Sequence, residues 1–406
     1  MKSKFDRSQF GNQKKTGVQH YLLKLIHKIL YTLDRNSKGE VLAVIANLYD
    51  WRQAFDLQCP KLGLESFKKN GVRPSLLPIL KSYFQNRSMV VKWHGILSSE
   101  RKLYGGGPQG GIFGILEYLS QTNNILDFVE EDLRFKYFDD ASVLEIVNLL
   151  SVGLASHLSK NSILNNIPEH NQFIPSEHLQ STEYLKNVHE WSTAQQMELN
   201  IEKSNMMLFN FTHDHQFTTE VNYKNENLKI VDEKKLLGTI ITTDLKWHRN
   251  TQYIVKSAYA SFSILHKISE FGASNSDMVS IYTSYIRSVL EQSCTIWHSS
   301  LTVEDSEDIE RLQKCDLKVI LKHNYSTYEE ALETLMLAKL SDRRVKLCQK
   351  FARNCAKNPL TSDLFPKANK DRPKTRKQEE YVVTFANTER LKQSAVPYLQ
   401  RLLNQK

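Results

Sequence analysis

The sequence predicts an α+β fold up to about residue 246 and an all-helical part after it. Two short apolar runs rich in β-branched residues, at 41–50 and within 133–147, are typical of buried strands. Around them lie segments whose apolar residues recur every three or four positions, as in amphipathic helices. From Trp247 to Ala356 this helical pattern is nearly continuous, which indicates a separate helical domain.

The local patterns also define the order of the elements. We expect a loop over 1–19, a helix over 21–33 and a strand over 41–50. A helical region broken at Gly71 and Pro74 should follow over 60–87, then a hairpin over 88–104 that turns near His94 and Gly95. A core helix is expected over 115–129. A strand–turn–strand unit should follow over 133–147, with Asp139 and Asp140 at its turn. After it we expect a loop over 158–180, a helix over 183–198, a turn leading into a strand over 197–211, and a hairpin over 226–245.

The composition is that of an ordinary globular protein with an excess of basic residues. Of the 406 residues, 40% are hydrophobic and 24% are charged, which argues against disorder along the whole length. Lys and Arg number 54 and Asp and Glu number 45, so the net charge is +9. Such an excess favours a nucleic-acid partner, but it serves equally well to keep a basic surface soluble.

Cysteine usage and hydropathy bound the compartment. The cysteines are scattered, which predicts neither a zinc site nor a disulfide framework and favours a reducing compartment. No apolar stretch is long enough to span a bilayer, and the first residues lack the apolar core of a secretory signal. We therefore expect an intracellular protein of the nucleus, the cytoplasm or both, with no membrane partner.

Three aspartates at the ends or turns of the strand candidates carry the candidate chemistry. Asp50 ends the first strand, and Asp139 and Asp140 lie within the second. Carboxylates beside buried strands are costly unless a cation compensates them, and Mg²⁺ prefers such oxygen ligands. Two such ions can clamp the attacking and leaving oxygens of a phosphoryl transfer. Taken alone, the Asp139–Asp140 pair is more often just a polar hairpin turn.

The order and spacing of three motifs strengthen the interpretation of Asp139 and Asp140 as part of a catalytic site. DWRQAFD begins at Asp50, GGGPQGG covers 105–111 and YFDD covers 137–140. Together they resemble the reverse transcriptases of non-LTR (LINE-type) retrotransposons, whose motifs read D-x-x-x-A-F-D, G-x-P-Q-G and [FY]-x-D-D. The resemblance runs from about residue 8 to residue 365 and includes the segments SQFGNQKKTGVQH, LNIEKS, KLLGTIITTDLKW and LSDRR.

The resemblance implies a right-hand polymerase, with an α+β palm built on an antiparallel sheet and an all-helical thumb. The implied divisions are a remnant of the fingers and upstream region over 1–35 and the palm with part of the fingers over 36–246. The helical thumb and connection would cover 247–360, and a basic tail would cover 361–406. It also implies that the N-terminal side is cut short, since the family carries further finger segments and an endonuclease there. The basic run at 370–377 would contact phosphates or remain a solvated, disordered end.

The family's metal site carries over onto the aspartates. Asp50 and Asp139 would bind two Mg²⁺ ions, with Mn²⁺ as the alternative metal, and Asp140 would lie beside them. Lys203 matches a lysine that protonates or neutralises the leaving pyrophosphate. A solvated surface lysine is the competing interpretation of Lys203.

The nucleotide and primer contacts carry over in the same way. Phe55 matches the steric gate that excludes a ribose 2′-OH, although core packing would explain it equally. Gln109 and Gly110 would line the incoming nucleotide, with an ordinary turn as the alternative. Leu237 and Gly238 match the primer-grip turn.

The implied function is RNA-directed DNA polymerase, with an RNA template, a DNA primer and dNTPs as partners; the sequence leaves the oligomeric state open. The alternatives are an inactive retroelement remnant that binds nucleic acid, a viral-type RNA-dependent RNA polymerase, and an unrelated helical scaffold. Some positions depart from the family pattern: Gly17 and Val18 stand where Ser-Thr is usual, and Ser204 replaces a common Thr.

Overall fold

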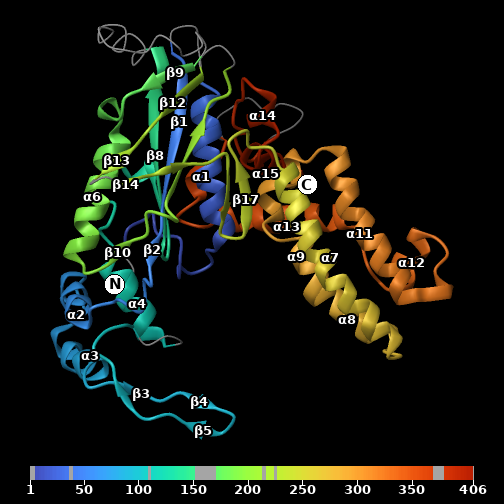
Figure 1. Ribbon diagram of the computed structural model, residues 1–406. Coiled ribbons are helices and arrows are strands. Elements are labelled where there is room, and N and C mark those ends of the chain that lie inside the picture. The colour runs from blue at the N-terminus through green and yellow to red at the C-terminus, as the bar shows by residue number, and fades with distance from the viewer. Residues whose placement is uncertain are drawn as a thin grey trace. The chain divides into compact units, whose positions relative to one another are not determined.

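The computed structural model describes residues 5–35, 40–107, 111–150, 171–212, 216–223, 226–368 and 379–405 (Figure 1). The chain forms two compact units. The first consists of Met1–Gln13, Lys38–Leu208 and Thr212–Val231, and the second of Lys14–Ser37, Phe209–Phe211 and Asp232–Lys406. Both α-helices and β-strands occur along the chain, so the fold is mixed, as the sequence predicts.

A five-stranded sheet forms the centre of the first unit. Its order is β15-β11-β1-β8-β7, with bounds Lys229–Ile230, Asn205–Phe209, Leu42–Tyr49, Asp140–Asn148 and Arg134–Tyr137. The central strand β1 is buried along almost its whole length, as its run of β-branched and small residues predicts. β8 pairs antiparallel with both β1 and β7, whereas β11 and β15 pair in parallel. The expected antiparallel sheet is therefore wrong at this edge, because the chain makes a long excursion after β11 and returns in the same direction.

The helices of this unit within the described residues include α2 (Pro60–Lys69), α3 (Leu77–Phe84), α4 (Ile112–Gln121) and α6 (Gln180–Ala194). The predicted break between α2 and α3 is confirmed, because Gly71 adopts φ +78° and a 3-10 turn begins at Pro74. Short strands also belong to this unit, among them β2 (Trp51–Arg52), β9 (Asn171–Ile174), β10 (Glu198–Leu199), β12 (Gln216–Thr219), β13 (Asn222–Tyr223) and β14 (Glu226–Asn227).

The core helix expected over 115–129 is shorter than the apolar pattern suggests. α4 ends at Gln121, and turns occupy the following residues. The Thr122 hydroxyl donates to the Tyr118 carbonyl at 2.8 Å, and the Asn123 side chain accepts from the Asp6 N–H at 2.9 Å. The Thr122 contact to a carbonyl of its own helix competes with helix continuation, and the distant segment at Asp6 holds Asn123 outside the helix, which together explain the early end.

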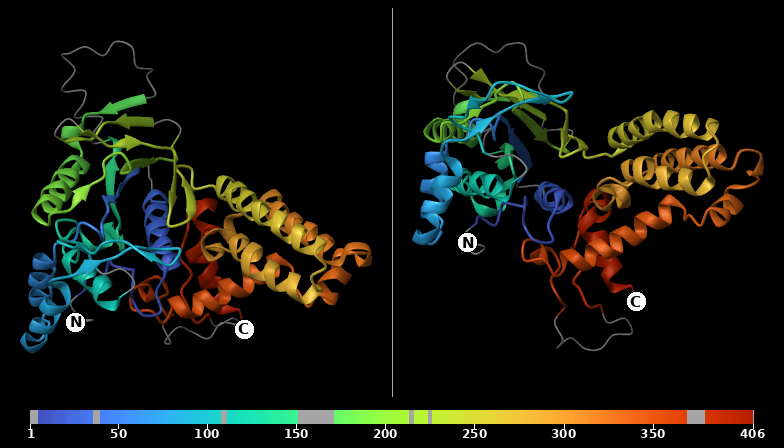
Figure 2. Two further views of the ribbon diagram at one scale, coloured as in Figure 1. Left: turned by 60° about the horizontal axis from the view of Figure 1, so that its bottom comes forward. Right: turned by 90° about the horizontal axis from the view of Figure 1, so that it is seen from below.

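A hairpin occupies 88–102, as predicted (Figure 2). Its base pairs β3 (Ser88–Met89) with β6 (Arg101–Lys102), and its tip pairs β4 (Lys92–Trp93) with β5 (Ile96–Leu97). His94 and Gly95 form the turn, with φ +46° and +85°. Two successive positive φ values are typical of the tight turns that match strand twist.

Three other boundaries differ from the sequence predictions. The turn between β7 and β8 consists of Phe138 and Asp139, so Asp140 already belongs to β8. α6 begins at Gln180 rather than at 183, and Gln196 with φ +57° ends the helical region before 198. Within the expected loop 158–180, residues up to 170 lie outside the described residues, and β9 is a strand rather than loop.

The second unit is mainly helical (Figure 2). Its helices are α1 (Val18–Leu33), α7 (His248–Glu270), α8 (Asn275–Ile281), α9 (Arg287–Leu290), α10 (Cys294–Trp297), α11 (Val303–Leu321), α12 (Tyr328–Thr334), α13 (Leu340–Cys355), α14 (Glu389–Lys392) and α15 (Ala395–Asn404). The hairpin expected within 226–245 is confirmed as β16 (Glu233–Leu236) and β17 (Thr239–Thr242). Among the helices within the described ranges, none is both long and apolar enough to cross a membrane.

The end of the chain is folded where the structure describes it. Leu391, Val396 and Leu399 are each no more than 1% exposed, and α15 packs against α13. A disordered end is therefore wrong for 379–405. The basic run 370–377 lies outside the described residues.

Candidate active site

The three predicted aspartates lie at one end of three adjacent strands. Tyr49, the last residue of β1, pairs with Ala141, so Asp50 follows β1 at the end where Asp140 begins β8. Tyr137 pairs with Asp140 across the two-residue turn that contains Asp139. The register thus brings all three aspartates to the same end of the β1–β8–β7 ladder.

The backbone of Asp50 is held on both sides by one turn. Its N–H donates to the Ser204 hydroxyl at 3.1 Å, and its carbonyl accepts from the Asn200 N–H at 2.8 Å. The Ser204 hydroxyl in turn donates to the Asn200 carbonyl at 2.8 Å. Since this turn is the LNIEKS motif, the motif fixes the place where the chain leaves β1. Lys203 lies in the same turn with an exposed side chain.

A second segment holds the turn that carries Asp139. The Gln9 side-chain carbonyl accepts from the N–H groups of Gly11 and Phe138, at 2.8 Å and 3.2 Å. Phe138 adopts φ +55°, which costs a non-glycine residue energy unless its surroundings hold it. A Cβ on Gly11 would lie 2.8 Å from the Phe138 nitrogen, so only glycine allows this approach. The SQFG segment therefore supports the YFDD turn.

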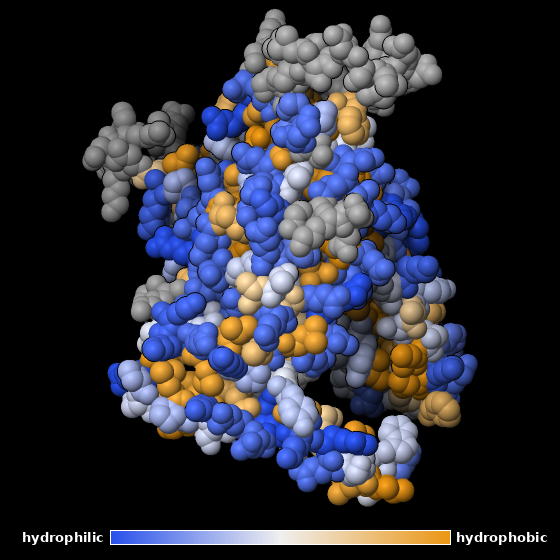
Figure 3. All heavy atoms as spheres, turned by 60° about the vertical axis from the view of Figure 1, so that its left-hand side comes forward, coloured by the Kyte–Doolittle hydropathy of each residue, from blue (hydrophilic) through white to orange (hydrophobic). Residues whose placement is uncertain are grey.

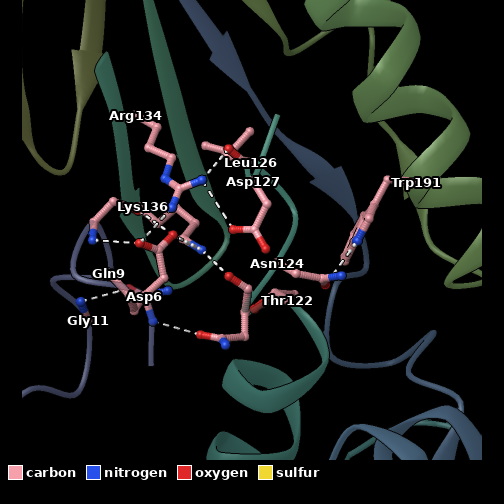
Figure 4. A network of polar contacts seen from close by, with 12 residues as sticks. Asp6, Gln9, Gly11, Thr122, Asn124, Leu126, Asp127, Arg134, Lys136 and Trp191 are labelled. Carbon is pink, nitrogen blue, oxygen red and sulfur yellow. Dashed lines mark hydrogen bonds and ion pairs between the residues drawn. The ribbon is translucent and has the colours of Figure 1, made fainter. Parts of the chain in front are cut away.

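A buried ion-pair network anchors this segment to β7 (Figure 4). Lys136, 1% exposed, lies 2.7 Å from the Asp6 carboxylate, and Arg134 donates to the same carboxylate at 3.3 Å. Burial alone would raise the pKa of Asp6, but the Lys136 charge and the hydrogen bonds from Lys136 and Ser8 lower it. Burial lowers the pKa of Lys136, opposed by Asp6. A buried pair of this kind adds little net stability, because the cost of removing both charges from water offsets their attraction.

Tyr118 connects the aspartates to the core. Burial raises the pKa of its phenol, and the charges of Asp139, Asp140 and Asp50 raise it further, so all three act on one group. The Phe55 ring stacks on Tyr118, with ring centroids 4.6 Å apart, and packs against the core while remaining partly exposed. This contact agrees with the packing interpretation of Phe55. The steric-gate role stays a prediction.

The glycine run that precedes Pro108 lies against residues 55–58. Gly106, with φ +80°, donates its N–H to the Gln58 carbonyl at 2.8 Å, and the Gly107 N–H donates to the Phe55 carbonyl at 2.8 Å. A Cβ on Gly106 would meet the Asp56 carbonyl oxygen at 3.0 Å. The first two motifs are therefore held together by backbone contacts. Gln109 and Gly110 lie outside the described residues.

Beneath this contact lies a buried acid. Glu117 is fully buried and neither carboxylate oxygen has a hydrogen-bond partner; the same holds for the amide atoms of buried Gln58. Burial raises the pKa of Glu117 to about 7, against a smaller lowering by Arg87. A Cβ on Gly63 would lie 2.3 Å from the Glu117 carboxylate, which explains a glycine inside α2.

The predicted primer-grip residues belong to the second unit, whereas the aspartates belong to the first. Leu237 and Gly238 form the turn of the β16–β17 hairpin, with φ +48° and +84°. A Cβ on Gly238 would meet the Gln292 side chain at 2.2 Å. Leu237 also lines a cavity of about 700 Å³ together with residues near the start of α1, among them Lys15 and His20.

The donor atoms at the strand ends suit a hard divalent cation. Asp50, Asp139 and Asp140 supply the carboxylate oxygens that Mg²⁺ prefers. In their present conformations, however, no group of three or more His, Cys, Asp or Glu side chains among the described residues is placed to hold a metal ion. The ligand types and the strand register fit the ions, while the side chains are not gathered into a closed ligand set.

Several positioning residues lie outside the set that the sequence predicted. Asn200 and Ser204 hold Asp50, Gln9 holds the Asp139 turn, and Tyr118 lies close enough to the acids for their charges to raise its pKa. The motifs LNIEKS and SQFG contain three of these four residues, so the family resemblance already marked the segments in which these three residues lie. Tyr118 has no motif of its own and is recognised only from its contacts.

Comparisons with known proteins do not assign a family. No protein-family model and no curated protein matches the chain. Similar solved structures include telomerase from Candida albicans in complex with a TWJ fragment of telomeric RNA, at 11% identity and TM-score 0.39, covering 88% of this chain and 54% of that one. Apo telomerase from Candida tropicalis is similar at 13% identity and TM-score 0.37, covering 87% and 55%. The chain thus spans about half the length of these structures, and a likeness of this size carries no functional conclusion.

Proposed function

We propose that this protein is an RNA-directed DNA polymerase that extends a primer 3′-OH with dNTPs by two-metal nucleotidyl transfer. The observation that carries the proposal is the register of β1, β8 and β7, which brings Asp50, Asp139 and Asp140 to one end of the sheet. The motifs DWRQAFD, GGGPQGG and YFDD add sequence support in the order typical of reverse transcriptases. Their form favours descent from a non-LTR retrotransposon.

The residues divide the work as follows. Asp50 and Asp139 would hold two Mg²⁺ ions, which supply charge stabilisation for the attacking and leaving oxygens. The turn at Asn200–Ser204 fixes the Asp50 backbone, and Gln9 fixes the turn before Asp140. Lys203, exposed in the first of these turns, would neutralise or protonate the leaving pyrophosphate. Positioning and charge stabilisation are the main protein contributions to such a transfer.

Primer extension tests the proposal directly. An oligo(dT) primer on poly(rA) should be extended by the full chain with dTTP and Mg²⁺, but not with EDTA. Asp139→Ala should abolish extension, whereas Glu131→Gln, which removes an exposed carboxylate, should leave it unchanged. Extension with rUTP as efficient as with dTTP would instead indicate an RNA polymerase.

A second candidate is a protein that binds nucleic acid without catalysis. It is favoured by the excess of Lys and Arg, 54 against 45 Asp and Glu, which suits binding to a polyanion. This candidate predicts template-primer binding that Asp139→Ala does not alter, together with no metal-dependent extension by the wild type.

A further inference from the structure

A basic groove lies at the base of the 88–102 hairpin. It has a cavity volume of about 760 Å³, a size typical of ligand-binding clefts. The start of α2, the end of α3 and both strands of the hairpin base line it. Four of its lining residues are cationic, namely Lys61, Lys81, Arg87 and Lys102, against the two acids Glu65 and Glu100.

The positive charge in this groove is poorly compensated. Among the ion pairs within the described ranges, none includes Lys61, Lys81 or Lys102, and all three side chains are exposed. Lys61 also stands in the first turn of α2, where the helix dipole disfavours a cation. Three exposed lysines without a carboxylate partner among the described residues, together with Arg87, make a local positive field that attracts an anionic ligand.

Arg87 connects the groove to the glycine run. Its guanidinium donates to the carbonyls of Gly105 and Gly106, the first at 3.2 Å, while its Nε is buried without a partner. The Gly106 N–H donates to the carbonyl of Gln58, which follows the DWRQAFD segment in the sequence. A ligand in the groove would therefore contact a side chain that also holds part of the candidate active site.

Exposed rings accompany the cations. Tyr104, which lines the groove, is 91% exposed, and Trp93 at the hairpin tip is 73% exposed. In Figure 3, hydrophilic and apolar side chains alternate over the hairpin at the lower edge of the view. Cations that follow a phosphate backbone, interleaved with aromatic rings on which bases stack, are typical of proteins that bind single-stranded nucleic acid.

We infer that this groove binds the phosphate backbone of a single-stranded nucleic acid, with Tyr104 stacking on a base. The inference rests on the proposed function, for which it names the position of the unpaired strand on the first unit. Exposed aliphatic residues at the hairpin tip, such as Ile96 and Leu97, suit a protein contact better than a phosphate. The cations instead gather at the base, and their charge selects a polyanion.

Binding of fluorescein-labelled 20-mers of rU and dT to the full chain tests this inference. The titrations are made in EDTA and over a series of NaCl concentrations, so that catalysis plays no part. Lys81→Ala/Lys102→Ala should weaken binding about tenfold and make the salt dependence shallower, because fewer counterions are released. Tyr104→Ala should weaken binding severalfold, and Tyr104→Phe should restore it. Comparison of the rU and dT affinities distinguishes RNA from DNA as the preferred strand.

Lys68→Ala/Lys69→Ala is the matched control, since it removes two exposed charges from α2 outside the groove. An equal loss of affinity in both double variants would show that only the net charge of the protein matters, and it would overturn the inference. Unaltered binding in the groove variants, with or without a change in oligomeric state, would also overturn it. If the wild type binds through the groove but never extends a primer, the inference stands while the proposed polymerase activity fails.

Discussion

At the scale of residues, the candidate site depends on backbone contacts as much as on carboxylates. Asp50 has its N–H and its carbonyl both bonded to the 200–204 turn. Phe138 keeps a left-handed backbone conformation because Gln9 accepts its N–H. The sequence motifs predicted the aspartates. They did not predict these supports, because a hydrogen bond between residues 154 positions apart leaves no local pattern.

Removal of the Ser204 hydroxyl should displace Asp50. Ser204→Ala takes away the acceptor for the Asp50 N–H, so we expect kcat to fall about tenfold, equivalent to ~1.4 kcal/mol. Template-primer affinity should stay unchanged, because the serine is buried. Thr193→Ala, which removes a hydroxyl bonded to its own exposed helix, is the control. A Ser204→Ala enzyme with wild-type kcat would contradict this role.

Addition of one methyl group at Gly11 should disturb the Asp139 turn. Gly11→Ala places a carbon 2.8 Å from the Phe138 nitrogen, closer than atoms allow, so the turn must move. We expect a loss of about 1–3 kcal/mol in the free energy of unfolding and a lower extension rate. Gly17→Ala, whose added carbon meets nothing within 4 Å, should change both quantities little. Equal effects of the two substitutions in urea unfolding would refute the steric argument.

The buried Glu117 should make stability depend on pH. Its pKa in the folded protein, about 7, lies above the value of 4.5 in the unfolded chain, so the folded state binds the extra proton. The protonated Glu117 therefore contributes to the free energy of unfolding in full below pH 4.5, and this contribution is lost as pH rises through 7. Between these limits the loss is on the order of 3 kcal/mol. Urea unfolding from pH 5 to 8 should show a flatter profile for Glu117→Gln than for Glu131→Gln, and parallel profiles would argue against a protonated Glu117.

At the scale of elements, periodicity predicted what is local. β1, the break at Gly71 and the two hairpins at 88–102 and 233–242 were predicted because apolar patterns and positive-φ residues define them. The helix expected to 129 ends at Gln121, since polar side chains there bond to the backbone instead. The fold of 379–405 was also missed, because its packing against α1 and α13 depends on residues far away in the sequence.

Asp34 anchors this C-terminal segment to α1. Its carboxylate accepts from the N–H of Asn387 and from the N–H and hydroxyl of Thr388, all within 2.8 Å. Asp34→Ala leaves these donors unpaired, so we expect a loss of about 2–4 kcal/mol and faster hydrogen exchange over 387–404.

The control is another contact of α1, made by its residue Lys24. Asp363→Ala breaks an ion pair with Lys24 at 3.0 Å in which the acid is 60% exposed, so it should cost less than about 1 kcal/mol. Protection at 387–404 that survives Asp34→Ala would show that apolar packing alone holds the segment.

At the scale of the whole molecule, the two units are interleaved along the chain. Residues 14–37 join the C-terminal half, and residues 1–13 join the unit that holds the aspartates. Local patterns do not predict such grouping, because it depends on which distant apolar faces bury one another. The palm and thumb divisions therefore remain predictions that rest on the family resemblance.

The basic charge of the chain should appear in its binding. With a net charge of +9, template-primer binding should weaken about 100-fold between 50 and 200 mM NaCl if about four phosphates are contacted. Fluorescence anisotropy at several salt concentrations measures this slope. A flat profile would exclude phosphate contacts as the source of affinity.

The central claim is that three carboxylates at the β1–β8–β7 strand ends form one metal-dependent site. Single-turnover extension by one dTTP, measured for Asp50→Asn, Asp139→Asn, Asp140→Asn and Glu131→Gln, tests it most directly. We predict losses of at least about 1,000-fold for the first two, a smaller loss for Asp140→Asn, and wild-type rates for Glu131→Gln. Wild-type rates in Asp50→Asn or Asp139→Asn would contradict the claim, because extension would then proceed without the proposed ligands.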